Sequence, residues 1–307
     1  MKKNNQLLII LSFISIYFIW GSTYLMNKIV VTEVPPLFLA GLRFSFAGIL
    51  LFFICLGLKK ELRIKTRELM NCIISGFLFL VYGNGVFVWA LKYIDSGFAA
   101  LEASLQPLVI LLLLWIIDKK KPKLTSLIGV GLGIFGMYLL VNQENILLSK
   151  ESLIGVFMIF SCVVCWSFAS IFNSKAALPK NFLVSSFYQM SSAGVLLLLC
   201  SLCFGETWVP IQDWSSKSLI SMALLVIFGS IVAFTSFNYL LKTVSTEKVA
   251  THSYVNPIVA LFLGWYFLNE VISFQSIIAT VVLLTGVYFI NSSKKRKAKN
   301  WRLKKAV

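Results

Sequence analysis

Three ionisable residues of this chain lie within long apolar segments, and their side chains are the ones best suited to chemistry. Arg43, Glu102 and His252 each occupy a segment long enough to cross a bilayer. A charged or titratable group in lipid is costly, so such groups face a protein interior or a water-filled cavity. We therefore expect these three residues to contact a substrate or an ion.

The positions of these residues follow an internal repeat. Glu102 and His252 are separated by 150 residues, and each lies five residues before the proline of its segment. Arg43 corresponds to Gln189 at an offset of 146. The helical rise places Arg43 roughly 11 Å and Glu102 roughly 8 Å below the same membrane face. This predicts a cluster of Arg43 with Glu102 near one face and a cluster of Gln189 with His252 near the other.

Two roles are open for each of these groups. Arg43 and Glu102 form either a buried neutralising pair that only holds helices together or part of a substrate site. His252 is either a hydrogen-bonded packing residue or a proton-sensitive group, since imidazole titrates near neutral pH.

Aromatic and amide side chains extend the candidate pathway. A tryptophan in an apolar segment is either an interfacial belt residue or part of a cavity wall. Trp20 and Trp166 recur in register at the offset of 146, which favours the cavity wall. Buried amides need partners in lipid, so we expect them to face protein or water. The predicted substrate pathway comprises Trp20, Arg43, Asn84, Trp89, Glu102, Trp166, Gln189 and His252.

The cysteines do not predict a metal site. The two CxxC pairs, Cys162/Cys165 and Cys200/Cys203, lie in apolar segments at depths that differ by roughly 10 Å, too far apart for one tetrahedral site. A single histidine leaves no multi-histidine metal site, and no nucleophile-elbow pattern occurs. We expect no metal, no other cofactor and no enzymatic activity, with cysteine acting as a small buried hydrophobe.

The composition is typical of a polytopic membrane protein. Only 13% of the 307 residues are charged and the mean hydropathy is +0.86, whereas about a quarter of a soluble chain is charged. The first apolar segment is expected to be an uncleaved helix, because it is long and no convincing cleavage site follows it. Ten segments are long enough to cross a core of about 30 Å as helices: 7–27, 36–58, 69–91, 97–117, 124–141, 153–173, 182–204, 218–240, 248–268 and 273–291.

The basic residues predict the orientation of the chain. If the N-terminus is inside, the inside segments carry 23 of the 28 lysines and arginines, and the outside loops carry four. By the positive-inside rule both termini are cytoplasmic. The basic tail, residues 294–307, is expected to touch anionic lipid at about 1 kcal/mol per basic residue, so the net charge of +16 does not predict a nucleic-acid partner.

The repeat itself predicts the architecture. Trp20 recurs as Trp166, and Gly136 recurs as Gly286 at the later offset of 150. Each copy carries five apolar segments, an odd number, so two copies thread the bilayer in opposite directions, as in inverted-repeat transporters. We predict an all-α polytopic membrane protein with ten transmembrane helices. The first five-helix repeat covers residues 1–145 and the second covers residues 150–293.

Short strings spread in order along the whole chain resemble the EamA-type permeases of the drug/metabolite transporter superfamily. One departure is that Glu102 stands where similar proteins carry a small or apolar residue. Another is that Asn269 precedes Glu270 where they read Gly-Glu. The strings that carry the resemblance are Ile19-Trp20-Gly21-Ser22-Thr23, Ala40-Gly41-Leu42-Arg43-Phe44, Gly97-Phe98-Ala99-Ala100, Tyr254-Val255-Asn256-Pro257 and Phe267-Leu268-Asn269-Glu270.

The resemblance implies a secondary carrier of the bacterial inner membrane, with a central cavity between inverted halves and peripheral fifth and tenth spans. Such permeases commonly export amino acids, related metabolites or toxic compounds. We therefore expect an exporter of a small amino acid-like metabolite or drug that works by alternating access, with protons as the candidate coupling ion. The alternatives are an importer or exchanger of the same fold, and a membrane protein that does not transport.

Overall fold

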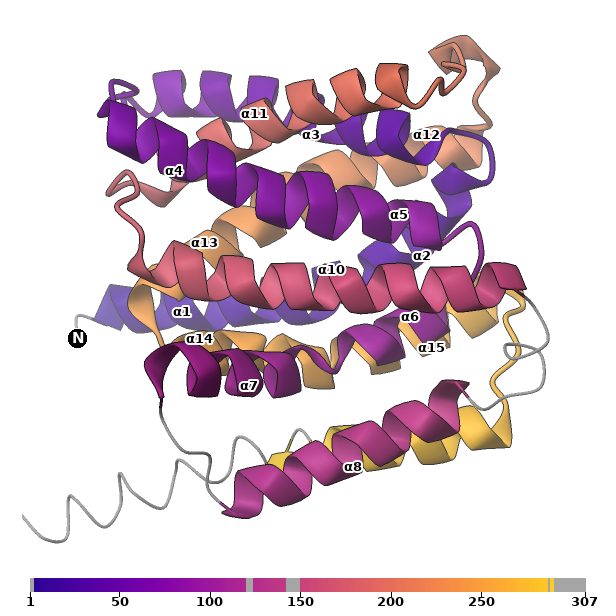
Figure 1. The fold of residues 1–307 in the computed structure, drawn as a ribbon. Helices are drawn as coiled ribbons and strands as arrows, with labels where there is room; N and C mark the ends of the chain where they lie inside the picture. The colour runs from indigo at the N-terminus through magenta and orange to yellow at the C-terminus, as the bar shows by residue number, and fades with distance from the viewer. Residues whose placement is uncertain (1–2, 120–123, 142–149, 287, 290–307) are drawn as a thin grey trace, which may run out of the picture.

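The computed structural model describes residues 3–119, 124–141, 150–286 and 288–289, and every regular element in these ranges is helical. The predicted basic tail, 294–307, lies outside the described residues. Figure 1 shows the long helices running back and forth along one common direction. In chain order the elements are α1 (Lys3–Ile14), η1 (Ser15–Ile19), α2 (Trp20–Val31), α3 (Pro36–Gly57), α4 (Thr66–Gly76), η2 (Phe77–Val86), α5 (Phe87–Ala90), α6 (Ser96–Ala103), α7 (Gln106–Asp118), α8 (Leu124–Val141), α10 (Lys150–Lys175), α11 (Phe182–Cys203), η3 (Ile211–Asp213), α12 (Ser216–Leu224), η4 (Leu225–Val232), α13 (Ala233–Thr243), α14 (Thr246–Val249), η5 (Ala250–Tyr254) and α15 (Asn256–Leu268).

Seven helical runs in the described residues are long and apolar enough to cross a membrane, which agrees with a polytopic membrane protein. Two shorter apolar helices, Leu124–Leu139 and Phe274–Gly286, coincide with the fifth and tenth expected segments. The ten-helix count and the pair of five-helix repeats stay predictions. The seven runs are Gln6–Val31, Pro36–Gly57, Thr66–Ala90, Ser96–Ile117, Lys150–Lys175, Phe182–Cys203 and Ser216–Thr243.

The expected fourth and ninth segments are interrupted rather than continuous, and proline is the reason. Pro107 and Pro257 lie in the first turns of α7 and α15. Proline has no N–H, and its ring clashes with the carbonyl four residues earlier, so a helix restarts there. The carbonyls that lose a donor belong to Ala103 and Ser253. The two interrupted spans pack against each other, α6 on α15 and α7 on η5.

Three other spans contain π-helical segments, which are η1, η2 and η4. A π-helical turn shifts the backbone hydrogen bonds, and such turns are frequent at functional sites. The first CxxC pair lies beside η2, where the thiol of Cys162 donates to the carbonyl of Tyr82 at 3.7 Å and that of Cys165 to the carbonyl of Leu78 at 3.3 Å. These cysteines therefore supply donors to the backbone of a π-helical segment.

Helices α3 and α11 make the most intimate helix contact of the bundle. A Cβ atom added to Gly48 would lie 2.6 Å from the hydroxyl of Ser191, and one added to Gly194 would lie 2.6 Å from the backbone nitrogen of Ser45. Gly48 and Gly194 are related by the offset of 146, and so are Ser45 and Ser191. Each helix therefore presents corresponding residues to the other. Small residues let the two backbones approach closely, as in other membrane helix pairs.

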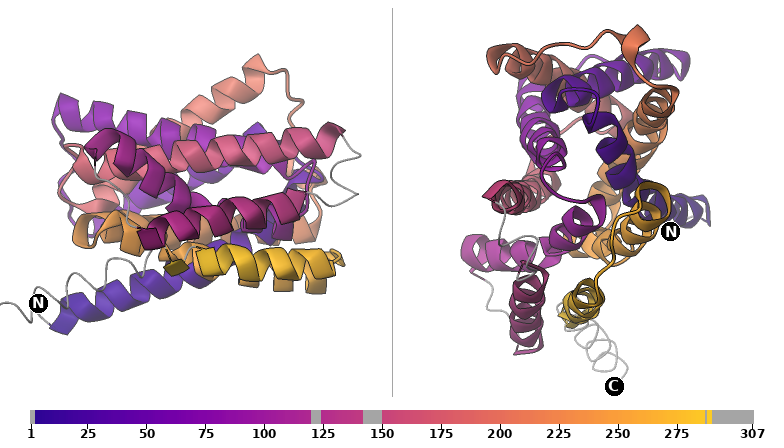
Figure 2. Two further views of the ribbon diagram at one scale, coloured as in Figure 1. Left: turned by 60° about the horizontal axis from the view of Figure 1, so that its bottom comes forward. Right: turned by 90° about the vertical axis from the view of Figure 1, so that its right-hand side faces the viewer.

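The helix α8 and the helix Phe274–Gly286 lie side by side at the edge of the bundle (Figure 2). A Cβ atom on Gly136 would lie 2.7 Å from Leu283, and one on Gly286 would lie 3.0 Å from the backbone nitrogen of Gly133. Glycines of both helices therefore form this interface, and α8 also packs against α6 and α7.

Acidic side chains cap helix starts at one end of the bundle. The carboxylate of Glu206 accepts the N–H groups of Leu37 and Phe38 at 3.1 and 2.8 Å, at the start of α3. That of Glu270 accepts the N–H groups of Ser96 and Gly97 at 2.9 and 3.1 Å, at the start of α6. The first N–H groups of a helix have no partner within the helix, and negative charge is favourable there. These caps join spans that are distant in sequence.

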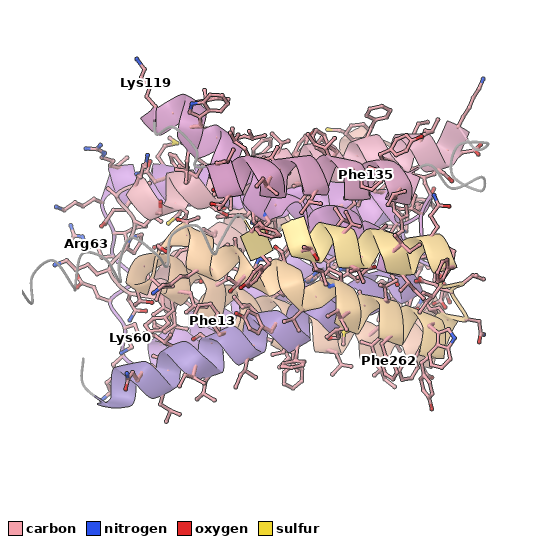
Figure 3. The ribbon with its side chains drawn as sticks, turned by 90° about the horizontal axis from the view of Figure 1, so that it is seen from below. Phe13, Lys60, Arg63, Lys119, Phe135 and Phe262 are labelled. Atoms are coloured by element: carbon pink, nitrogen blue, oxygen red, sulfur yellow. The ribbon has the colours of Figure 1, made fainter. Side chains whose placement is uncertain are left out.

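Basic residues gather at the opposite end. Lys60 follows α3 and Lys119 follows α7, and Figure 3 shows both with Arg63 at the same end of the bundle. Phe135 and Phe262 are exposed along its sides in the same view, whereas Phe13 is half-buried against the core. Charge at the ends and aromatic rings along the sides are the distribution that a bilayer requires.

Substituting Gly194 tests the close approach of α3 and α11. We expect Gly194→Ala to lower the stability of the purified protein by about 1–3 kcal/mol, because backbone atoms of α3 would have to move. Gly48→Ala should cost less, since a serine hydroxyl can rotate away. The measurement is the thermal unfolding midpoint in detergent. Gly57→Ala is the matched control, because a Cβ there meets nothing within 4 Å; equal midpoints for all three variants would contradict the packing.

The carboxylate of Glu33 makes stability depend on pH. It accepts hydrogen bonds from the side chain and backbone of Ser215 at 2.7 and 3.1 Å, and these bonds hold the pKa of Glu33 below its usual range. A lowered folded-state pKa stabilises the fold above the unfolded pKa, and this contribution is lost as pH falls through the folded pKa. We expect the midpoint difference between wild type and Glu33→Gln to shrink on acidification. Glu61→Gln, which changes an exposed carboxylate outside this contact, is the matched control.

Candidate functional site

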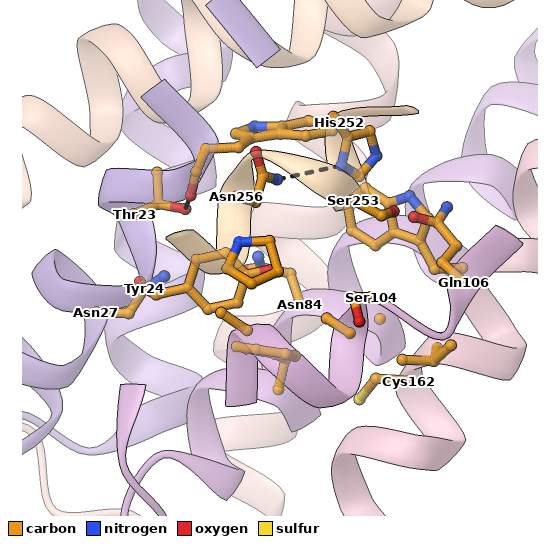
Figure 4. A pocket seen from close by; sticks show the side chains of 18 of the residues that line it. Thr23, Tyr24, Asn27, Asn84, Ser104, Gln106, Cys162, His252, Ser253 and Asn256 are labelled. Carbon is orange, nitrogen blue, oxygen red and sulfur yellow. Dashed lines mark hydrogen bonds between the residues drawn. The ribbon is translucent and has the colours of Figure 1, made fainter. Parts of the chain in front are cut away.

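A cavity opens between the two interrupted segments, α6–α7 and η5–α15, and the elements α2, α3, η2, α5 and α10. Its empty space, counted together with the open mouth, is about 760 Å³. Figure 4 shows the polar side chains around it. The lining residues are Trp20, Thr23, Tyr24, Asn27, Arg43, Gly83, Asn84, Phe87, Ala100, Ala103, Ser104, Gln106, Cys162, Val163, Trp166, His252, Ser253, Asn256 and Pro257.

Arg43 brings a positive charge to this cavity and has no acidic partner among the residues that the structure describes. Its Nε donates to the hydroxyl of Ser230 at 2.8 Å, and its Nη1 lies 3.4 Å from Oδ1 of Asn27 and 3.5 Å from Oδ1 of Asn84. All of these acceptors are neutral, and Asn84 and Ser230 come from the π-helical segments η2 and η4. A guanidinium has five N–H donors. Its Nη2 donates no hydrogen bond within the described residues, so donors remain for a ligand.

Two tryptophans form an aromatic wall of the cavity. The rings of Trp20 and Trp166 meet edge to face with centroids 5.7 Å apart, and both contact Phe237. The indole N–H of Trp20 donates to the carbonyl of Gly229 at 3.2 Å, which fixes this ring. Edge-to-face aromatic pairs are favourable beyond the area they bury. The wall is therefore rigid and apolar, and it lies beside the guanidinium group of Arg43.

His252, which lies on η5, brings a second polar group to the cavity. Its ring meets Trp20 edge to face at 5.3 Å, and its Nδ1 lies 3.1 Å from the side-chain amide of Asn256 (Figure 4). The amide orientation that satisfies every atom places Oδ1 toward His252 and directs the NH2 group to the carbonyls of Ile16 and Tyr17. Nδ1 then carries the proton, and Nε2 is an acceptor without a partner.

The two expected charge clusters are not the ones that form. Arg43 bonds to neutral groups of other spans rather than to Glu102, and His252 bonds to Asn256 rather than to Gln189. The expected depths of these residues do not determine which side chains they contact. The helix that carries Glu102, α6, packs on α2, α10 and α15, whereas Arg43 turns toward α2, η2 and η4.

Glu102 lies behind the cavity wall rather than in it. The residue is fully buried, and neither carboxyl oxygen has a hydrogen-bond partner. The next two residues, Ala103 and Ser104, do line the cavity. A buried polar group without a partner costs about 1–3 kcal/mol, so this position calls for a specific reason.

Gln189 belongs to a closed amide cluster instead of the cavity. Its Oε1 accepts from Asn238 at 3.0 Å, and its NH2 group donates to Asn173 at 3.3 Å and Ser185 at 3.2 Å. Asn173 also donates to Asn238 and accepts from Ser75. This cluster is satisfied internally and leaves no open position for a ligand.

Trp89 also lies away from the cavity, where its ring contacts Phe204 at 5.5 Å. Of the eight predicted pathway residues, the cavity is lined by Trp20, Arg43, Asn84, Trp166 and His252.

Several cavity residues were missing from the predicted pathway, although the sequence held a signal for some. Gln106 and Asn256 each precede the proline of an interrupted span at the offset of 150, and both line the cavity. Asn27 recurs as Asn173 at the offset of 146 and contacts Arg43. The contribution of Ser230 had no such signal, because it depends on how η4 packs against α3.

Removal of Gln189 tests the amide cluster. We expect Gln189→Met to destabilise the protein by about 1–3 kcal/mol, because a donor of Asn238 and an acceptor of Asn173 lose a partner in a buried site. Thermal unfolding in detergent measures the effect. Gln212→Met is the control, since Gln212 is exposed. A Gln189→Met midpoint equal to that of the control would show that the cluster contributes nothing to stability.

Comparison with known proteins identifies the family. A model described as the EamA-like transporter family matches twice, over residues 7–142 and 153–292. The uncharacterized inner membrane transporter YedA of Escherichia coli (strain K12) is 32% identical over 283 residues, which cover 91% of this chain and 89% of that protein. The uncharacterized transporter YoaV of Bacillus subtilis (strain 168) is 22% identical over 280 residues, covering 91% of this chain and 95% of YoaV.

A solved protein structure shares the fold, with a TM-score of 0.69, 20% sequence identity, and coverage of 95% of this chain and 98% of its own. The match to the family model over both stretches confirms the resemblance seen in the sequence. The apolar helices and the YedA relative agree with a location in the inner membrane. The chain is therefore a membrane transporter that belongs to the EamA-like transporter family.

Proposed function

We propose that this transporter exports a small metabolite with an anionic group and an aromatic or apolar body, by alternating access between its two halves. The observation that carries the proposal is the buried guanidinium of Arg43, which reaches the cavity without any acidic partner. A buried charge is costly unless it is paired. A carboxylate on the substrate would supply that pair, and guanidinium groups suit carboxylates because they can donate two parallel bonds.

The rest of the cavity supports the same substrate class. The edge-to-face rings of Trp20 and Trp166 offer an apolar surface next to Arg43. Nε2 of His252 is buried and has no partner among the described residues, and it would accept from a donor group on the substrate once it is exposed to the cavity. An amino acid-like compound has both a carboxylate and a donor, so it would engage both poles.

The interrupted spans support an alternating-access mechanism. In many transporters the substrate site lies where helices of the two halves are discontinuous at corresponding positions. Here the interruptions precede Pro107 and Pro257, and residues beside both line the cavity. With the basic end cytoplasmic, as the charge distribution favours, Arg43 would be the pole nearer the outside and His252 the pole nearer the cytoplasm.

Comparing deletion and overexpressing cells tests the direction. Metabolites would be measured inside the cells and in the medium. Accumulation of one anionic metabolite inside the deletion strain is the expected outcome. Depletion inside that strain would instead indicate an importer, and an unchanged profile in both strains would favour a drug pump.

Three matched probes test the substrate class on the purified protein. L-phenylalanine carries a carboxylate and an ammonium group, 3-phenylpropionate carries only the carboxylate, and 2-phenylethylamine carries only the ammonium group. We expect the two carboxylates to bind, measured by calorimetry in detergent, and the amine not to bind. Preferential binding of the amine would refute an anionic substrate.

Neutralising Arg43 tests its role as the anion pole. We expect Arg43→Gln to weaken binding of the carboxylate probes by about 2 kcal/mol, or roughly thirtyfold, as for a lost charge-assisted hydrogen bond. Arg43→Lys should retain part of the affinity. Lys92→Gln removes one positive charge from an exposed position and serves as the control. Unchanged affinity in a folded Arg43→Gln protein would assign Arg43 a structural role only.

A further inference from the structure

Glu102 is a buried acid that the proposed substrate site does not use. It lies at the end of α6, where the fourth span is interrupted, and its exposed fraction is 0%. Both carboxyl oxygens lack a hydrogen-bond partner. The cavity begins at the next residue, Ala103, and Cys162 of α10 lies both on the cavity and within electrostatic range of Glu102.

No positive charge compensates this carboxyl group within the described residues. On α2, Lys28 donates to the carbonyls of Leu91 and Ile94 at 2.7 and 2.8 Å, at the capped end of the bundle. The described parts of α8 and α15 carry no charged residue, and the tyrosines of these helices, Tyr138 and Tyr266, are exposed. On α10 the titratable neighbour is the uncharged thiol of Cys162.

The remaining groups near the interruption do not pair with Glu102 either. Asp95 begins the same span at the far end of α6, beside the cap formed by Glu270. His252 on η5 is bonded to Asn256. An isolated carboxylate is very costly in a low-dielectric interior, whereas the protonated acid is tolerated. In this conformation Glu102 is therefore uncharged and holds a proton.

We propose that Glu102 is the proton-binding site of the transport cycle, protonated and shielded in this conformation and hydrated by the cavity when the fourth span rearranges. The step is a simple ionisation, in which the O–H bond of the acid breaks, the proton goes to cavity water and the carboxylate remains. The interruption before Pro107 makes such a movement local, because proline supplies no N–H to the carbonyl of Ala103. This inference rests on the proposed transport function.

Infrared spectroscopy tests protonation without any substrate. Wild-type protein in liposomes at neutral pH should show a protonated-carboxyl C=O band that shifts in D2O. We expect the band to be lost in Glu102→Gln and kept in Glu61→Gln, which changes an exposed acid. Glu102→Asp should restore a band. Wild-type spectra identical to those of Glu102→Gln would overturn the proposal.

Flux measurements test whether this proton is exchanged during transport. With 3-phenylpropionate in liposomes, wild-type flux should respond to an imposed pH gradient. Glu102→Gln should lose this response while its affinity for the probe stays within a few-fold of wild type, and Glu102→Asp should regain it. A gradient response that survives in Glu102→Gln would exclude Glu102 as the exchanging group. If the wild-type protein moves none of the three probes, the proposed substrate class fails, while the infrared comparison still decides whether Glu102 holds a proton.

Discussion

The structure depends on one constraint, that a polar group in the membrane core must find its partner within the protein because no water is there to supply one. The helix starts at one end are capped by carboxylates from distant spans, as Glu206 does for α3 and Glu270 for α6. The thiols of Cys162 and Cys165 bond to carbonyls of the π-helical segment η2. Satisfying polar groups in this way ties together spans that are far apart in sequence.

Three residues that depart from this constraint lie at the interruptions before α7 and α15, and two others, Thr125 and Ser218, lie elsewhere in the described residues. Glu102 lies beside one interruption, and His252 and Ser253 lie in the other, and each has a buried polar atom without a partner. A buried polar group without a hydrogen-bond partner raises the free energy of the folded protein, and a ligand or a structural change can supply the missing partner. These groups without partners lie next to the cavity, where a substrate would enter.

The two halves use equivalent positions for different purposes. Arg43 and Gln189 are related by the offset of 146, and so are their partners Asn27 and Asn173. Gln189 is neutral and closes its cluster through short amide bonds with Asn238. Arg43 has longer contacts to its amides and keeps donors for the cavity. A single change of residue type thus separates a closed amide cluster from a guanidinium that lines the cavity.

The class of protein, the apolar helices, the family and five of the residues that line the cavity could be predicted from the amino-acid sequence. These follow from composition, segment length and the recurrence of residue types, which are local properties of the chain. The hydrogen-bond partners of these side chains could not be predicted and follow from the packing of the helices. The tertiary structure placed Arg43 beside Ser230 and left Glu102 alone behind the wall, because neighbour relations depend on how helices pack and where proline and π-helical turns redirect them. The repeat predicts which positions correspond in the sequence, whereas helix packing decides what each residue contacts.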